Sequence, residues 1–182
     1  MTWGLLYAVL LATLVVRVRT EPGPRPAPVH PLGGESLWLT RLHHRLFFLL
    51  LAGPPLESLL VPGAPAGRGA GAAAFGFGVV LYRLAGRTLG DALSPFTEPR
   101  RSAPLVTAGP YAMVRHPMYL GEALIAVGAP LTLGSRHLVW LALPALVVLL
   151  VRTLREDEAL ARTFPEFSHY AARTRRLIPF LY

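Results

Sequence analysis

The sequence contains no cysteine and no lysine, and charged residues of either sign are scarce. Without cysteine the chain has no disulfide, no thiolate nucleophile and no cysteine-ligated metal site, so its residues do not report the redox state of the compartment. Only 15% of the 182 residues are charged, compared with about 25% in a typical soluble domain. This shortage of charge argues against a soluble globular protein.

Apolar residues are abundant instead, because they make up 53% of the chain and the mean hydropathy is +0.45. A helix that crosses a bilayer needs about 20 mostly apolar residues. Several apolar runs approach this length, at residues 3–16, 37–61, 69–84, 118–133 and 137–151. The sequence therefore predicts an all-α, polytopic membrane helix bundle with about five transmembrane helices. The last two runs, joined by residues 134–136, are expected to form a C-terminal helical hairpin followed by a cytoplasmic tail.

The run at residues 37–61 is the least regular of these segments. Arginines and histidines open it, and Pro54 and Pro55 interrupt it. It crosses the membrane only if Pro55 is accommodated as a kink, and an interfacial or broken helix is the alternative. The preceding residues 21–34 are rich in proline and glycine, which predicts a linker without regular helix. The glycines and alanines of residues 69–84 favour close approach of neighbouring helices.

The arginine distribution predicts the topology, since arginine in short loops marks the cytoplasmic side. With about five spans, the arginines fall on one side except Arg68 and Arg136. Because the positive charges follow the first apolar run, we expect a retained helix with its N-terminus outside, not a cleaved signal peptide. The protein is thus predicted to lie in a bacterial-type inner membrane or its equivalent, with the C-terminus cytoplasmic. The formal charge of +8 is spread over span ends, so nucleic-acid binding is not expected.

Two stretches hold nearly all the polar chemistry: LVTAGPYAMVRHPMYLG at residues 105–121 and RTLREDEALARTFPEFSHYAARTRRLIP at residues 152–179. They lie at the two ends of the expected hairpin, so Arg115 and Arg152 should be neighbours in space. Pro117 is well placed as the first residue of a helix. The free N–H groups at that helix start, beside His116, suit a carboxylate or phosphate. An interfacial arginine followed by a capping histidine would explain the same residues without function.

In the second stretch, Arg152 and Glu156 are four residues apart and share a helix face. Glu156 and Asp157 point in different directions, so the spacing does not favour a general acid/base pair of carboxylates. No histidine lies on the same turn, and we therefore expect no metal site. A solvated charged turn at the end of a membrane helix is the simpler alternative.

Read together, the two stretches resemble the isoprenylcysteine carboxyl methyltransferase and phospholipid methyltransferase superfamily of integral membrane enzymes. The resemblance covers roughly the last 80 residues, and paired motifs are more specific than either one alone. It implies S-adenosylmethionine as cofactor, and it places the substrate-orienting arginine at Arg152, with Arg115 as a second catalytic candidate. The implied cofactor contacts are Leu105, Val106, Tyr111, His116, Pro117, Met118, Tyr119 and Glu156. The chain departs from the family pattern at Pro165, where glycine is usual, and at Phe167, where tyrosine is usual.

The resulting prediction is a membrane methyltransferase that acts on a lipid-like or prenylated acceptor. A carboxylate acceptor is favoured, because Arg152 suits an anion and a dry site favours charge neutralisation. Residues 1–84 would supply N-terminal transmembrane helices and residues 85–182 the catalytic region. One alternative is an NADPH-dependent membrane sterol or steroid reductase, whose RHP-x-Y-x-G-E run is matched through Glu122, although Met118 replaces the usual asparagine. The other is a non-enzymatic membrane protein in which the motifs only shape the hairpin.

Overall fold

The structure is a computed structural model that describes residues 2–15, 34–64, 66–100 and 102–178. Over these residues the chain is helical and contains no β-strand, apart from an isolated bridge between Val114 and Arg175. The predicted all-α class is therefore confirmed. The α-helices are α1 (Thr2–Val15), α3 (Gly34–Leu60), α4 (Arg68–Leu89), α5 (Pro117–Leu133), α6 (Ala142–Thr163) and α7 (Phe167–Arg173). Short 3₁₀ turns are η1 (Gly90–Ala92), η2 (Gly109–Ala112) and η3 (Leu138–Leu141).

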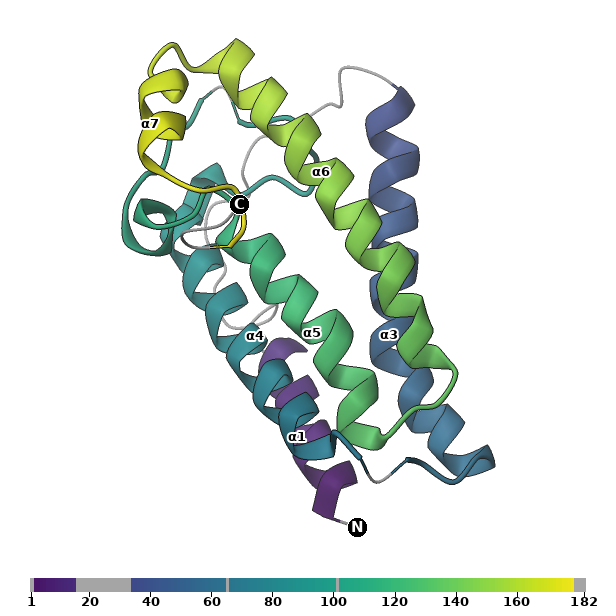
Figure 1. The fold of residues 1–182 in the computed structure, drawn as a ribbon. Helices are drawn as coiled ribbons and strands as arrows, with labels where there is room; N and C mark the ends of the chain where they lie inside the picture. The colour runs from purple at the N-terminus through teal and green to yellow at the C-terminus, as the bar shows by residue number, and fades with distance from the viewer. Residues whose placement is uncertain (1, 16–33, 65, 101, 179–182) are drawn as a thin grey trace.

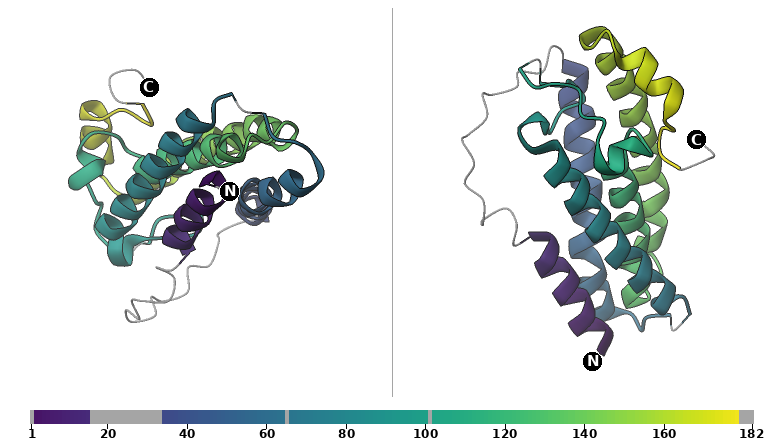
Figure 2. Two further views of the ribbon diagram at one scale, coloured as in Figure 1. Left: turned by 90° about the horizontal axis from the view of Figure 1, so that it is seen from below. Right: turned by 90° about the vertical axis from the view of Figure 1, so that its left-hand side faces the viewer.

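Four long helices, α3 to α6, run alongside one another in alternating directions (Figure 1). As a result, the beginnings of α3 and α5 and the ends of α4 and α6 lie at the same end of the bundle, where α7 also packs. The shorter helix α1 lies near the opposite end and packs against α4 and α5, as the turned views show (Figure 2). This arrangement brings the two polar stretches of the sequence to one end of the molecule.

The outer surface of the bundle suits lipid. The segments Arg68–Ala92 and Leu138–Thr163 are long and apolar enough to cross a membrane, while Thr2–Val15 and Pro117–Leu133 are apolar but shorter. Large apolar side chains are exposed on α3, α4 and α6, with Leu59 and Leu60 at 83% and 84%, and exposed apolar surface on several helices is unusual for a monomeric soluble protein. A membrane helix bundle is thus supported, whereas the number of crossings and the positions of the termini stay predictions.

Helix α3 resolves one sequence ambiguity, because it continues through Pro54 and Pro55 to Leu60. The alternative of a broken helix does not hold for this segment, although whether it crosses the membrane stays open to test. Near its end, the Glu57 carboxylate accepts hydrogen bonds from the backbone N–H groups of Arg136, His137 and Leu138 at 3.0, 2.9 and 3.2 Å. Glu57 therefore ties the turn of the α5–α6 hairpin to α3. The expected linker at residues 21–34 lies almost wholly outside the described residues.

The hairpin has the predicted arms but a longer connection. Helix α5 begins at Pro117, as expected, and ends at Leu133, with Gly134 at a φ of 69° as its left-handed cap. The chain then passes through η3 before α6 begins at Ala142. Helix α6 extends twelve residues past the last apolar run because residues 152–164 contain neither proline nor glycine, and the next proline is Pro165. That extension places the charged residues of the second stretch on a regular helix.

Helices α4 and α5 approach closely through glycine, as the sequence predicted. A Cβ atom added at Gly78 would lie 2.7 Å from the carbonyl oxygen of Gly121, and one added at Gly121 would lie 2.8 Å from the backbone nitrogen of Tyr82. Next to this contact, Phe75 and Ile125 are fully buried. Because Gly78 and Gly121 have no side chains, the backbones of α4 and α5 can contact each other directly.

We expect Gly78→Ala to destabilise the protein by about 1 to 3 kcal/mol, because overpacking forces backbone shifts. Gly76→Ala is a matched control on the same helix, since its added Cβ would meet only Leu10 Cδ2 at 3.7 Å. Thermal unfolding of both variants in the same detergent measures the difference. Equal melting temperatures for the two variants would show that the α4–α5 contact tolerates a methyl group.

Candidate active site

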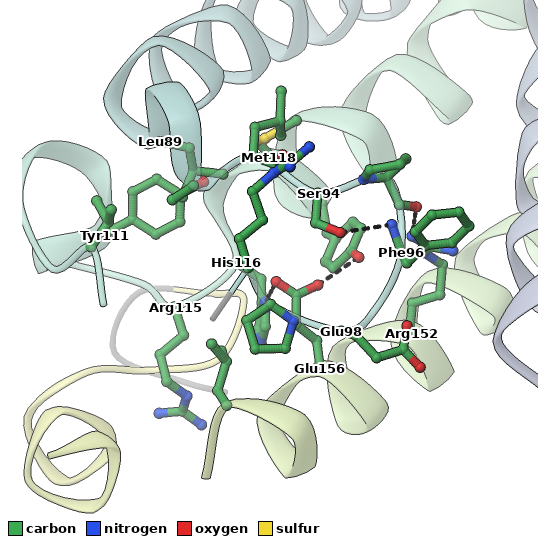
Figure 3. A pocket seen from close by; sticks show the side chains of 18 of the residues that line it. Leu89, Ser94, Phe96, Glu98, Tyr111, Arg115, His116, Met118, Arg152 and Glu156 are labelled. Carbon is green, nitrogen blue, oxygen red and sulfur yellow. Dashed lines mark hydrogen bonds and ion pairs between the residues drawn. The ribbon is translucent and has the colours of Figure 1, made fainter. Parts of the chain in front are cut away.

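A cavity of about 450 Å³ opens at the end of the bundle where the two polar stretches meet. Its lining comes from α3, α4, residues within 89–100 and 104–106, η2, the start of α5, α6 and α7. Figure 3 shows side chains converging on this space from several elements, among them Tyr111, His116, Arg152 and Glu156. The size lies within the range of about 300 to 1,000 Å³ that is usual for small-molecule sites.

The structure brings together nearly all of the residues singled out from the sequence. The cavity is lined by Leu105, Val106, Tyr111, Arg115, His116, Met118, Tyr119, Arg152 and Glu156. Pro117 lies outside this lining and is fully buried at the first position of α5. Its contribution is to start the helix, because the ring fixes φ and the missing N–H has no partner to lose there.

His116 lies between two carboxylates. Its Nε2 is 2.8 Å from Asp157 Oδ1, and its Nδ1 is 3.9 Å from Glu156 Oε1. The side chain is almost fully buried, so these two acids define its surroundings. Nε2 of His116 is thus engaged by Asp157. Nδ1, on the side of Glu156, is the ring nitrogen that can contact a molecule in the cavity. The adjacent residues Glu156 and Asp157 on α6 therefore both lie close to His116. Because neighbouring side chains on a helix point in different directions, the sequence did not predict this arrangement.

Asp157 is the centre of an ionic cluster that the sequence analysis did not identify. Besides His116, its carboxylate accepts hydrogen bonds from Arg115 Nε and Nη2 at 3.3 and 3.2 Å and from Arg176 Nε at 2.8 Å. Arg115 also donates to the carbonyl oxygen of Thr174 at 2.7 Å. Charged partners of this kind give the stronger class of hydrogen bonds. The cluster fastens the C-terminal tail beside the start of α5.

Backbone bonds reinforce that attachment. The N–H groups of Arg115 and His116 donate to the carbonyl oxygens of Arg175 and Arg176 at 2.7 and 3.0 Å. Tyr170 in α7 donates its hydroxyl to the carbonyl oxygen of Tyr111 at 2.7 Å. Burial raises the pKa of Tyr170 to about 12, so this hydroxyl keeps its proton and remains a donor at physiological pH. The tail therefore forms one wall of the site.

Tyr119 and Glu156 form a second polar contact at the cavity. The Tyr119 hydroxyl donates to Glu156 Oε2 at 2.7 Å, which links α5 to α6. The Arg152 guanidinium carbon lies 5.6 Å from the centre of the Tyr119 ring, within range of a cation–π contact. The Tyr119 ring, the Glu156 carboxylate and the Arg152 guanidinium thus lie together at the open end of the α5–α6 hairpin.

Arg152 is 3% exposed and is held by α3 and by the segment that follows η1. Its Nη1 donates to Thr40 Oγ1 at 2.9 Å and its Nη2 to the carbonyl oxygen of Pro95 at 3.1 Å. Among the described residues, its Nε has no hydrogen-bond partner and it forms no ion pair with Glu156. Arg115 and Arg152 share the cavity, as expected of neighbours, but they bind different partners.

Helix α3 contributes polar residues that sequence reasoning had not assigned to the site. Thr40 holds Arg152, and both His43 and His44 line the cavity. His43 Nε2 is 3.5 Å from Glu122 Oε2, a residue of α5 that lines the same space. In the sequence, these two histidines stand together at the start of an apolar run. They were interpreted as residues of the membrane interface and therefore not assigned to the site. Within the described ranges no group of three histidine or acidic side chains is arranged to hold a metal ion.

Comparison with known proteins gives two findings. The model of the phospholipid methyltransferase family matches residues 67–166, more than half of the chain. The nickel-cobalt-cadmium resistance protein NccN of Alcaligenes xylosoxydans xylosoxydans is 40% identical over 81 residues, and the cobalt-zinc-cadmium resistance protein CzcN of Cupriavidus metallidurans is 39% identical over 83 residues. Each alignment covers 44% of this chain and 38% of the relative. The similarity therefore spans well under half the length of either relative.

Proposed function

Because the chain belongs to the phospholipid methyltransferase family, we propose that it is a membrane methyltransferase that uses S-adenosylmethionine and modifies a lipid-like or prenylated acceptor. The family supports methyltransferase activity at a membrane. The observation that carries the finer proposal is a cavity in which both polar stretches meet, with Glu156, Tyr119 and Arg152 along its wall. Its position at one end of the apolar helices suits an acceptor that is held in a membrane.

The residues present fit the cofactor chemically. S-adenosylmethionine, when bound, supplies a methyl group on a sulfonium, and it also carries an ammonium, a carboxylate and an adenine. Glu156 suits the ammonium or the ribose hydroxyls, and the Tyr119 ring suits a cation, with a contribution of about 0.5 to 2 kcal/mol. We assign the cofactor contacts to Leu105, Val106, Tyr111, His116, Met118, Tyr119 and Glu156. Pro117 is assigned the role of setting the backbone that presents them.

The two arginines receive different roles. Arg152 has a buried Nε without a partner in the described part of the chain, and an unmet buried donor favours an anionic or carbonyl group in the cavity. We therefore assign Arg152 to orient the acceptor. Arg115 is engaged by Asp157 and by the carbonyl oxygens of Ala171 and Thr174. Its proposed role is positioning, because it holds the tail against the site.

Positioning is the main contribution expected of such a site. Alignment of two bound reactants can supply about 7 to 11 kcal/mol of the barrier reduction. Buried walls on α3, α5 and α6 exclude water, which strengthens the electrostatic contacts inside. The sequence-based preference for a carboxylate acceptor rests on Arg152, which suits an anion, and on a dry site, which favours charge neutralisation.

The proposed organisation keeps residues 85–182 as the catalytic region and residues 1–84 as N-terminal transmembrane helices. Thr40, His43 and His44 extend the acceptor side of the site into α3. We further propose that the motifs and the C-terminus face the cytoplasm and that the N-terminus lies outside, since the arginines concentrate at the end of the bundle that holds the cavity.

The test of the proposal is calorimetric binding to the detergent-purified full chain. We expect S-adenosylmethionine to bind and NADPH not to bind. Glu156→Ala should weaken binding by about 1 to 3 kcal/mol, because it removes a charged hydrogen-bond partner from a half-buried site. Glu158→Ala, an exposed acid on the same helix, is the matched control. Binding of NADPH alone would place the chain among the reductases, and unchanged affinity in Glu156→Ala would remove that residue from the cofactor site.

A further inference from the structure

Arg152 is a buried cation whose hydrogen-bond partners carry no charge. Its Nη1 donates to the hydroxyl oxygen of Thr40 at 2.9 Å, and its Nη2 donates to the carbonyl oxygen of Pro95 at 3.1 Å. The residue is 3% exposed, and over the described ranges no carboxylate forms an ion pair with it. Buried charges in proteins are usually paired, because removal of a charge from water costs free energy. The uncharged partners of Arg152 therefore call for an explanation.

A carboxylate is available on the same helix. Glu156 follows Arg152 by four residues on α6, so the two side chains share a face, and both line the cavity (Figure 3). Tyr119 contacts both of them, since its ring centre is 5.6 Å from the Arg152 guanidinium carbon and its hydroxyl donates to Glu156 Oε2 at 2.7 Å. Opposite charges at this spacing on a helix attract each other. Their separation in the structure means that another contact holds the guanidinium.

Helix α3 supplies that contact. Thr40 is 7% exposed and stands 112 residues before Arg152 in the chain. Its hydroxyl and the Pro95 carbonyl oxygen bind the two terminal nitrogens of the guanidinium, which fixes the position of this planar group. Thr40 lies outside residues 67–166, the part of the chain that matches the family model. The similarity to the family therefore does not account for its role.

We propose that Thr40 is a positioning residue that holds the Arg152 guanidinium away from Glu156; this inference rests on the proposed methyltransferase function. The contact keeps the arginine assigned to the acceptor separate from the carboxylate assigned to the cofactor. Without the Thr40 hydroxyl, the guanidinium turns toward the carboxylate of its own helix. The cofactor must then displace the guanidinium from Glu156 before it can bind there, so its affinity falls.

Glu156 is not the only acid in the cavity, because Glu98 and Glu122 also contribute to the lining. Glu98 lies in the segment that follows η1, and Glu122 lies on α5 with its Oε2 at 3.5 Å from His43 Nε2. Neither is assigned to the cofactor. A released guanidinium that paired with Glu98 or Glu122 would leave cofactor affinity unchanged, and that result would contradict the proposal.

A purely structural role for Thr40 predicts a different outcome. If the hydroxyl only fastened α3 to α6, its removal would lower stability, and any loss of cofactor affinity would not depend on the side chain at position 152. If Thr40 instead restrains the guanidinium, a second substitution that removes the guanidinium should cancel the loss. Such non-additivity is the signature of two residues that act through one contact.

The experiment measures S-adenosylmethionine binding to the detergent-purified full chain by calorimetry. Thr40→Val removes the hydroxyl and keeps the shape, and it should weaken binding about tenfold, which corresponds to about 1.4 kcal/mol. Thr40→Ser keeps the hydroxyl and should bind almost as the unchanged protein does. Thr13→Val is the control on α1, because this exposed threonine bonds to carbonyl oxygens of its own helix at 2.8 Å.

The decisive variant combines Thr40→Val with Arg152→Gln, and Arg152→Gln alone is its reference. We expect the double variant to recover the cofactor affinity that Thr40→Val loses, because no guanidinium is left to compete for Glu156. A loss that persists in the double variant would overturn the proposal, as would an equal loss in Thr40→Ser or no loss in Thr40→Val. All three results would leave the proposed methyltransferase function standing.

Failure of the unchanged protein to bind the cofactor would overturn both proposals. Thermal unfolding without cofactor shows whether each variant is folded. Should Thr40→Val not fold, Thr40→Ala tests the same hydroxyl with less bulk at the contact between α3 and α6. It carries the same expectation of weakened binding and of recovery when combined with Arg152→Gln.

Discussion

Asp157→Ala is expected to destabilise the protein by about 3 to 5 kcal/mol, the cost of removing one partner from a buried ion pair. The carboxylate holds Arg115, His116 and Arg176 at once. Without it, two guanidinium groups and a buried histidine lose this carboxylate as a partner, although Arg115 keeps its bonds to tail carbonyl oxygens. The tail residues should then be held less firmly against the start of α5, because their attachment would rely on the backbone bonds and on the Arg115 and Tyr170 contacts.

Chemical or thermal unfolding in detergent measures the loss, and hydrogen exchange at Arg115 and His116 reports detachment of the tail directly. Those two N–H groups donate to Arg175 and Arg176 and should exchange faster in the variant. Glu158→Ala is the matched control, since this neighbouring acid is exposed. A stability close to that of Glu158→Ala would mean that the cluster contributes no more than an exposed ion pair, about 0 to 1 kcal/mol.

Arg152→Lys is expected to lower kcat/KM by about 10²- to 10³-fold, within the range of about 2 to 5 kcal/mol found when a buried charged contact is truncated. The guanidinium donates to Thr40 and to the Pro95 carbonyl oxygen, and its Nε is buried without a partner among the described residues. A lysine keeps the charge but has a single nitrogen, so it cannot hold both anchors and an acceptor in the same geometry.

The assay compares steady-state methyl transfer with binding of S-adenosylmethionine. Because Arg152 is assigned to the acceptor, cofactor affinity should change little while kcat/KM falls. Arg162→Lys, an exposed arginine near the end of the same helix, is the control for loss of a guanidinium without loss of the site. Equal loss of cofactor affinity and turnover would move Arg152 to the cofactor side of the cavity.

Local features of the sequence were sufficient for much of the fold. Apolar run length predicted the helices, the proline after His116 predicted the start of α5, and glycine spacing predicted the close α4–α5 contact. Each of these sequence features lies within one helix turn or one helix. At that range, backbone geometry determines where the helix forms and which residues share a face. The convergence of the two polar stretches could also be predicted from the sequence, because a hairpin of two helices returns the chain to the side it left.

Tertiary structure decided which side chains meet inside the site. Arg152 and Thr40 are 112 residues apart, and His116 and Asp157 are 41 apart. Their contacts depend on how α3 and α6 are rotated and how far they are shifted along the bundle, and packing of the whole set of helices fixes both quantities. A histidine at the opening of an apolar run is read from sequence as an interfacial residue. Only the placement of α3 beside α5 turns His43 toward Glu122. The sequence by itself therefore determined the helices and the end of the bundle that bears the chemistry, while the partners of each charged group were settled by helix packing, because a side chain's neighbours on other helices are not encoded in its own segment.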